Sequence, residues 1–131
     1  MREMSLSGKR ILITRSEDQA EGFAALIRKR GGVPVLFPTI RLVPSEDTAP
    51  VDSALSRLSS FDWILFASAN AATFFCGRAA RAGVSKPPPG VRVASIGPGT
   101  SRELQRMGFS ADVTAVRHTA EGLVEVLREE G

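Results

Sequence analysis

Short apolar segments alternate with amphipathic segments five times along this chain, and that alternation constrains the fold more than any other feature. The apolar segments have the length of strands, and the segments between them carry apolar residues at helical spacing. Strand and helix in alternation predict an α/β fold with a mostly parallel sheet and right-handed crossovers, in a flavodoxin-like three-layer unit. The expected strands are residues 9–14, 33–37, 62–68, 91–96 and 111–116.

The first helix is marked by local signals at both ends. Ser16 and Gln19 have the spacing of a capping box, and Gly31 with Gly32 provides a left-handed stop. Its expected buried face holds four apolar residues one turn apart: Ala20, Phe23, Ala24 and Ile27. Further helices are expected over residues 48–58, 69–82 and 100–107 and after Thr119. Prolines at 38, 44 and 50 make the intervening segment an extended crossing and the best candidate for a boundary.

Composition excludes several functional classes. One cysteine and one histidine are too few for a disulfide framework or an ordinary zinc site, so no metal is expected. Cys76 falls on an apolar helical stripe and is predicted to lie in the core, and His118 is predicted to be an exposed bystander. The net charge of +3 favours anionic partners, but the basic residues are scattered, so nucleic acid is not indicated. Without an apolar run of membrane length or a signal peptide, no membrane is expected and the location predicted is cytoplasmic.

The stretch "ASIGPGT" at 94–100 places two glycines where a strand passes into a helix. It does not match a dinucleotide fingerprint, because Arg102 stands at the third glycine position and Pro98 removes an amide donor. The acidic residue expected about twenty positions later is also missing. Two interpretations stay open: a general anion site at Gly97, Gly99 and the free amides of Thr100 and Ser101, or a plain helix start capped by Thr100.

Two further loops at the carboxyl ends of expected strands have the same character. Ser68 and Asn70 are good helix caps and also suit a carboxylate ligand, and Thr14 with Arg15 forms another such corner. Ligands of parallel α/β sheets bind at this edge, so we expect the three anion-binding corners to lie on one rim. No acid/base pair or serine nucleophile elbow accompanies them, and no catalytic residue is assigned.

A resemblance to the uroporphyrinogen-III synthase family of tetrapyrrole biosynthesis covers essentially the whole chain from Gly8. It is carried in order by "GKRILITRSEDQAEGFAALIRKRGGVPVLFPTI", "FDWILFASANAATFF" and "VRVASIGPGTSRELQRMGF". The order and spacing of the threonine-arginine, proline-x-isoleucine, serine-x-asparagine and glycine-x-glycine-threonine motifs are specific, although each alone is weak. Ala67 departs from the threonine that the family usually has there.

The resemblance implies an enzyme that uses no cofactor. The linear hydroxymethylbilane loses its hydroxyl, inverts its last ring, ring D, and closes to uroporphyrinogen III. Its acetate and propionate carboxylates would meet Thr14, Arg15, Ser68, Asn70, Gly97, Gly99 and Thr100. Catalysis would consist mainly of holding the folded bilane with its ends together.

The family's two-domain plan also implies that this chain corresponds to the amino-terminal half. Residues 1–38 would be the strand-helix-strand portion of an incomplete first domain, and residues 39–131 would be most of the second. The returning part of the family, which carries the tyrosine expected to assist departure of the hydroxyl, has no counterpart, and the chain contains no tyrosine. We therefore expect the chain alone to be inactive. We also expect a partner chain, as a homodimer or by exchange of the first strand-helix unit.

Two alternative functions compete with the synthase. A flavodoxin-like or receiver-like module that binds a small anion without catalysis predicts a self-sufficient monomer. A nucleotide-dependent reductase is disfavoured by Arg102 and by the missing acidic residue.

Overall fold

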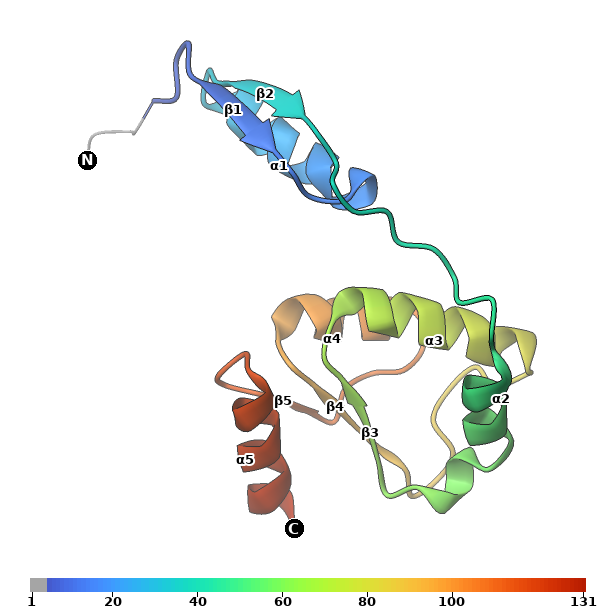
Figure 1. Ribbon diagram of the computed structural model, residues 1–131. Coiled ribbons are helices and arrows are strands. Elements are labelled where there is room, and N and C mark those ends of the chain that lie inside the picture. Colours follow the sequence, from blue (N-terminus) through green and yellow to red (C-terminus); the bar gives the residue numbers. More distant parts are fainter. Residues whose placement is uncertain (1–4) are drawn as a thin grey trace. The chain divides into compact units, whose positions relative to one another are not determined.

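The computed structural model describes residues 5–131 and divides the chain into two compact units (Figure 1). The first unit extends to Pro44, and the second runs from Ser45 to Gly131. Each unit contains its own parallel sheet, and no strand of one sheet pairs with the other among the described residues. Parallel sheets with helical crossovers confirm the α/β prediction.

The first unit is a single strand-helix-strand motif. It consists of β1 (Arg10–Ile13), α1 (Glu17–Lys29) and β2 (Val33–Leu36), with β1 and β2 parallel. Helix α1 covers one face of the two-stranded sheet, and the buried cluster between them is Ile13, Ala20, Ala24 and Ile27. This is the expected helix face with one exception, Phe23.

Phe23 was predicted to be buried, but its side chain is 49% exposed. The small residues Ala20 and Ala24 bring α1 close to the sheet, and Phe23 lies to one side with the Arg15 guanidinium 5.6 Å from its ring centre. Ser16 stands at the expected N-cap position, yet its side chain makes no capping hydrogen bond, so the predicted capping box does not form. Gly31 ends the helix with a φ of 78°, as predicted.

The second unit contains a sheet in the order β3-β4-β5, all parallel. Its elements in chain order are α2 (Ala49–Ser56), the short turn η1 (Leu58–Ser60), β3 (Trp63–Phe66), α3 (Ala69–Arg81), β4 (Arg92–Ser95), α4 (Pro98–Arg106), β5 (Val113–Thr114) and α5 (Ala120–Glu130). The last strand, expected over residues 111–116, is limited to Val113–Thr114. Helix α4 also begins two residues before the predicted Thr100, because Pro98 is well suited to the first turn of a helix.

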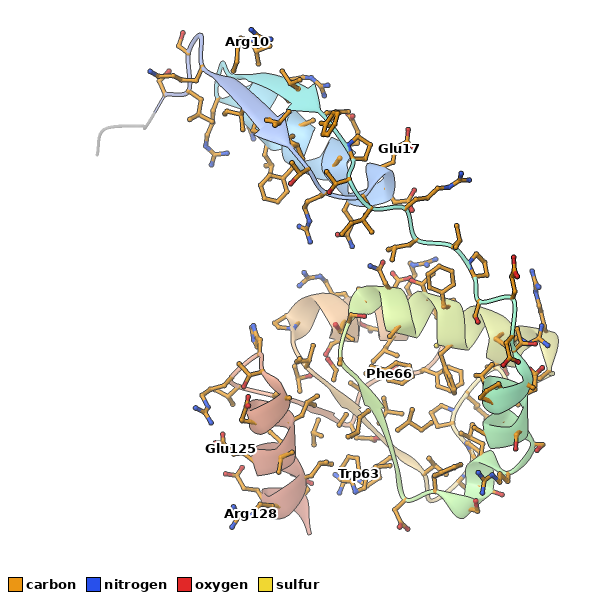
Figure 2. The ribbon with its side chains drawn as sticks, in the orientation of Figure 1. Arg10, Glu17, Trp63, Phe66, Glu125 and Arg128 are labelled. Carbon is orange, nitrogen blue, oxygen red and sulfur yellow. The ribbon has the colours of Figure 1, made fainter. Side chains whose placement is uncertain are left out.

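Helices cover both faces of this sheet, which confirms the three-layer prediction (Figure 1). Side chains alternate along β4: Val93 belongs to the cluster under α2, α3 and α4, and Ala94 belongs to the cluster under α5. Figure 2 shows the same alternation on β3, with Phe66 beneath α3 and Trp63 on the side of α5. The larger cluster contains Leu55, Leu58, Phe66, Ala72, Cys76, Ala79, Val93, Leu104 and Phe109.

Cys76 lies in this core, as predicted, and is 3% exposed. Burial raises the pKa of its thiol to about 11, with a smaller contribution from the charge of Glu103. A thiol in this environment stays protonated at neutral pH and is a poor nucleophile. The Phe75 ring lies nearby and contacts both Phe66 and Phe109 edge to face, with ring centres 5.4 and 5.8 Å apart.

The crossing segment is anchored at its start to the first unit. The Thr39 hydroxyl donates a hydrogen bond of 3.0 Å to the Thr14 carbonyl, and the Phe37 amide donates to the carbonyl of Ile13 at 2.8 Å. These bonds attach residues 37–39 to the first unit, which extends to Pro44. Over residues 5–131, no helix combines the length and the apolar character needed to cross a membrane.

Candidate functional site

The carboxyl ends of β3 and β4 bring two of the three predicted corners together. The strands are parallel, Phe66 lies opposite Ser95, and the Ile96 amide donates to the Phe66 carbonyl at 3.0 Å. The chain then enters α3 through Ser68 and α4 through Gly97, side by side at one edge of the sheet. The sequence placed these loops on a common rim, and for this pair the structure agrees.

Helix α3 begins with a side-chain cap. The Ser68 hydroxyl accepts a hydrogen bond from the Ala71 amide at 3.0 Å, which confirms the capping prediction for Ser68. Asn70 does not act as a cap, because it is the second residue inside the helix. The amides of Ala69 and Asn70 have no hydrogen-bond partner among residues 5–131, and no acidic side chain stands in the first turn.

Gly97 is the N-cap of helix α4, and its backbone is fully extended. Pro98 at the first helical position has no amide hydrogen, so the first free donors are the amides of Gly99 and Thr100. Two predictions are wrong here. Thr100 is not the cap but lies inside the helix with only 5% of its surface exposed, and the Ser101 amide is not free, because it donates to the Gly97 carbonyl at 3.0 Å.

A chain of three hydroxyl groups fixes the Gly97 peptide. The buried Ser95 hydroxyl donates to the Gly97 carbonyl at 2.8 Å and accepts from the Gly97 amide at 3.2 Å. A hydroxyl has one proton, so Ser101 must donate to Ser95, and Thr114 must in turn donate to Ser101, each at 2.8 Å. The Gly97 amide is therefore occupied, which leaves Gly99 and Thr100 as the donors of this turn.

His118 lies against the other side of Gly97. A Cβ atom at position 97 would be 3.2 Å from the Cγ of the imidazole, so the ring packs on the glycine. The loop that holds His118 is anchored by the Arg117–Glu125 ion pair and by the Thr119 hydroxyl, which caps α5 by accepting from the Gly122 amide at 3.1 Å. His118 is exposed, as predicted, but its ring packs against the Gly97 turn.

Sequence reasoning missed Arg102 as a candidate residue of this edge. Its Nη2 atom would lie 3.9 Å from a Cβ at Gly99, so the guanidinium folds back over the first turn of α4. No acidic side chain of residues 5–131 pairs with it. The signal available in the sequence was the position of this cation, two residues after the glycine-x-glycine-threonine motif.

Glu103 follows Arg102 in sequence but is held elsewhere. Its carboxylate accepts from Arg106 Nη2 at 2.6 Å and from the Thr73 hydroxyl at 2.8 Å, which ties α4 to α3. These bonds, that from Arg106 first, hold the pKa of Glu103 below its ordinary value. Glu103 is therefore ionised at neutral pH and neutralised by Arg106, which does not suit a general acid.

The third predicted corner belongs to the first unit and lies at the end of a different sheet. The prediction of three corners on one rim is thus wrong for Thr14 and Arg15, because β1 pairs only with β2. The Thr14 carbonyl accepts from Thr39, and the Arg15 guanidinium stacks on Phe23. The adjacent cleft of about 550 Å³ is lined by Ser16, Glu17, Asp18, Pro38, Thr39, Ile40, Arg41 and Leu42.

The edge of β3 to β5 therefore offers several hydrogen-bond donors to an anion. It combines two helix starts that contain no acidic residues with free amides, hydroxyl groups and the Arg102 cation. Together these groups favour a negative ligand. Among the described residues, no group of three or more His, Cys, Asp or Glu side chains is placed to hold a metal ion.

Comparison with known proteins gives a consistent set of matches. The model of the family described as uroporphyrinogen-III synthase HemD matches residues 21–131. A uroporphyrinogen-III synthase of Synechococcus elongatus is 35% identical over 125 residues, 95% of this chain and 47% of that protein. A porphyrin biosynthesis protein HemD of Ruminiclostridium josui is 26% identical over 129 residues, 95% of this chain and 26% of that protein.

A solved structure extends the match to the fold. The crystal structure of uroporphyrinogen-III synthetase from Helicobacter pylori matches 96% of this chain and 55% of its own chain, with a TM-score of 0.56 at 15% identity. At this identity the likeness concerns the fold alone. The chain thus spans about half of the Synechococcus relative and of this structure, and about a quarter of the Ruminiclostridium protein.

Proposed function

The chain belongs to the uroporphyrinogen-III synthase family, and on that premise we propose that it is the amino-terminal part of an enzyme that cyclises hydroxymethylbilane. In the proposed reaction the bilane loses its hydroxyl as water, its ring D is inverted, and ring closure gives uroporphyrinogen III. The observation that carries the proposal is the family match over residues 21–131. The donor-rich edge of the second unit is compatible with a substrate that has many carboxylates.

The proposed contacts follow from the free donors at that edge. Carboxylates of the bilane would accept from the amides of Gly99 and Thr100 at the start of α4, and from the start of α3, where Ser68 and Asn70 stand. The Gly97 amide is not a proposed donor, since it already donates a hydrogen bond to the Ser95 hydroxyl. Gly97 would contribute through its extended backbone and its lack of a side chain. Thr14 and Arg15 remain proposed substrate residues of the first unit, where the Arg15 guanidinium stacks on the Phe23 ring.

On this proposal the part of the enzyme present here positions the substrate and does not transfer protons. The charge of each carboxylate is balanced by helix starts and by backbone donors fixed before the ligand arrives. Holding the two ends of a flexible chain together converts ring closure into a favoured intramolecular step. No group that assists departure of the hydroxyl is proposed among the residues of this chain.

The decisive test is the isomer formed by the full-length gene product. Hydroxymethylbilane is supplied, the porphyrinogen product is oxidised, and the isomers are separated by chromatography. Formation of the type III isomer above a control without protein is expected, because closure without inversion gives a different isomer. A full-length product that leaves the isomer ratio at the control value would refute the proposal.

We also propose that the first unit requires a further polypeptide. The face of β1 and β2 opposite α1 carries Leu12, 61% exposed, and Val33, 48% exposed, and parallel sheets are normally covered on both faces. For this chain alone we propose a homodimer, or exchange of the first strand-helix unit between two copies. Light scattering on the isolated chain is expected to give twice the monomer mass, and a clean monomer would favour the self-sufficient module instead.

A further inference from the structure

We propose that Arg102 is a further substrate-binding residue, whose guanidinium binds one carboxylate of the tetrapyrrole chain together with the amides of Gly99 and Thr100. The inference rests on the proposed function and names one cation at that same site. Arg102 is the fifth of the nine residues of α4, and its Nη2 atom folds back to within 3.9 Å of the place that a Gly99 Cβ would occupy. The cation and the two free amides therefore share one small surface.

The charges around Arg102 leave it available to a ligand. The acid beside it, Glu103, is bound by Arg106 and Thr73, and no acidic side chain of residues 5–131 forms an ion pair with Arg102. The first turn of α4 contains no acid of its own. An exposed guanidinium beside free amide donors matches the two oxygens of a carboxylate, because both present N–H groups to the same ligand.

The turn at the start of α4 is also held rigidly. The Gly97 peptide is fixed on one side by the Ser95 hydroxyl and covered on the other by the His118 ring. The amides of Gly99 and Thr100 consequently hold their direction before a ligand binds. Gly99 itself keeps the approach open, since nothing except the Arg102 guanidinium lies within 4 Å of its missing side chain.

Helix electrostatics separate a binding role from a structural one. The helix dipole acts on charges in the first and last turns. Arg102 is the fifth of the nine residues of α4 and is exposed, so its removal should leave the melting temperature nearly unchanged. Arg81 provides the matched control, because it is an exposed arginine in the last turn of α3, at the opposite edge of the sheet. Removing Arg81 changes the net charge equally but should lower the melting temperature slightly.

The experiment measures binding of uroporphyrin III, the stable oxidised form of the proposed product, to the whole chain by fluorescence titration. Arg102→Gln is expected to weaken binding about 10-fold, the effect of losing one hydrogen bond to a charged group. Arg102→Lys should retain part of the affinity, and Arg81→Gln should change it less than about 2-fold, as expected for an exposed distant charge at physiological salt. The salt dependence of binding should also decrease in Arg102→Gln alone.

The possible failures are distinguishable. If the unaltered chain binds uroporphyrin III and Arg102→Gln binds equally well, the assignment of Arg102 is wrong and the proposed function stands. Equal weakening by Arg102→Gln and Arg81→Gln would also overturn the assignment, because it would indicate net charge rather than a contact. If the unaltered chain does not bind uroporphyrin III, both the proposed substrate contacts of this chain and the assignment of Arg102 are overturned.

Discussion

The two units of this chain are built from the same strand-helix-strand motif but differ in how much of their sheet is covered. In the second unit, helices pack on both faces, and Val93 and Ala94 on one strand are each fully buried. In the first unit a single helix covers one face, and Leu12 in the middle of β1 remains 61% exposed. A repeated motif thus gives a closed core only when enough copies stack beside one another.

The largest expected contrast is the cost of truncating a phenylalanine in each unit. Phe109 is 1% exposed and Phe23 is 49% exposed. Phe109→Ala should lower the free energy of unfolding by about 3–5 kcal/mol, whereas Phe23→Ala in the isolated chain should cost well under half of that.

Chemical denaturation measures both values, and labelling of the buried Cys76 thiol reports opening of the second unit alone. Similar losses for the two variants would mean that Phe23 is covered in solution. That result would point to a partner chain on α1.

Two glycines test how tightly each unit is packed. A Cβ at Gly122 would stand 2.0 Å from the backbone oxygen of Arg117, whereas one at Gly32 would stand 2.7 Å from the Ile27 Cγ2 atom. Gly122→Ala should cost about 1–3 kcal/mol, as overpacking does, and Gly32→Ala should cost less because a side chain moves more easily than a backbone.

Thermal unfolding compares the two variants. A larger loss for Gly32→Ala would show that the first unit is the more rigid of the two, contrary to its open face.

A smaller effect of opposite sign is expected at two helical glycines. At Gly22 in α1 and Gly77 in α3, nothing outside the local helix lies within 4 Å of the place that a Cβ would occupy. Alanine at either site should stabilise its unit by about 0.5–1 kcal/mol, because glycine loses more backbone entropy in a helix. Hydrogen exchange of the α1 and α3 amides measures each unit separately, and stabilisation of only one helix would reveal a hidden contact at the other.

The smallest expected effect is the pH dependence of one ion pair in the second unit. Hydrogen bonds from Arg78 hold the pKa of Asp52 below its ordinary value of 3.8. The pair therefore adds stability above that pH, and the contribution disappears as the pH falls through the lowered folded pKa.

Asp52→Asn should consequently lose less stability than the unaltered chain between about pH 6 and about pH 3. Urea unfolding at the two pH values measures the difference. In the first unit, the Arg28–Glu21 pair is more exposed, so Glu21→Gln should show no comparable change. An equal change in both variants would contradict this contrast between the units.

Much of the fold followed from patterns within single elements. Helical spacing placed Ala72, Cys76 and Ala79 in the core, and cap chemistry placed Ser68 and Thr119 at helix starts. The prediction that Phe23 is buried was wrong because helical spacing specifies a helix face but not the width of the surface that covers it. The prediction that Thr100 caps α4 was wrong because a helix can begin at Pro98.

The sequence by itself determined the order of strands and helices, the residues that each loop offers and, through family resemblance, a polycarboxylate substrate as the hypothesis. Only the tertiary structure decided which amides at the helix starts are free. Ser95, Ser101 and Thr114 meet across β4, α4 and β5, and His118 reaches Gly97 from the end of β5. Such contacts depend on which strands become neighbours, and local periodicity carries no information about that choice.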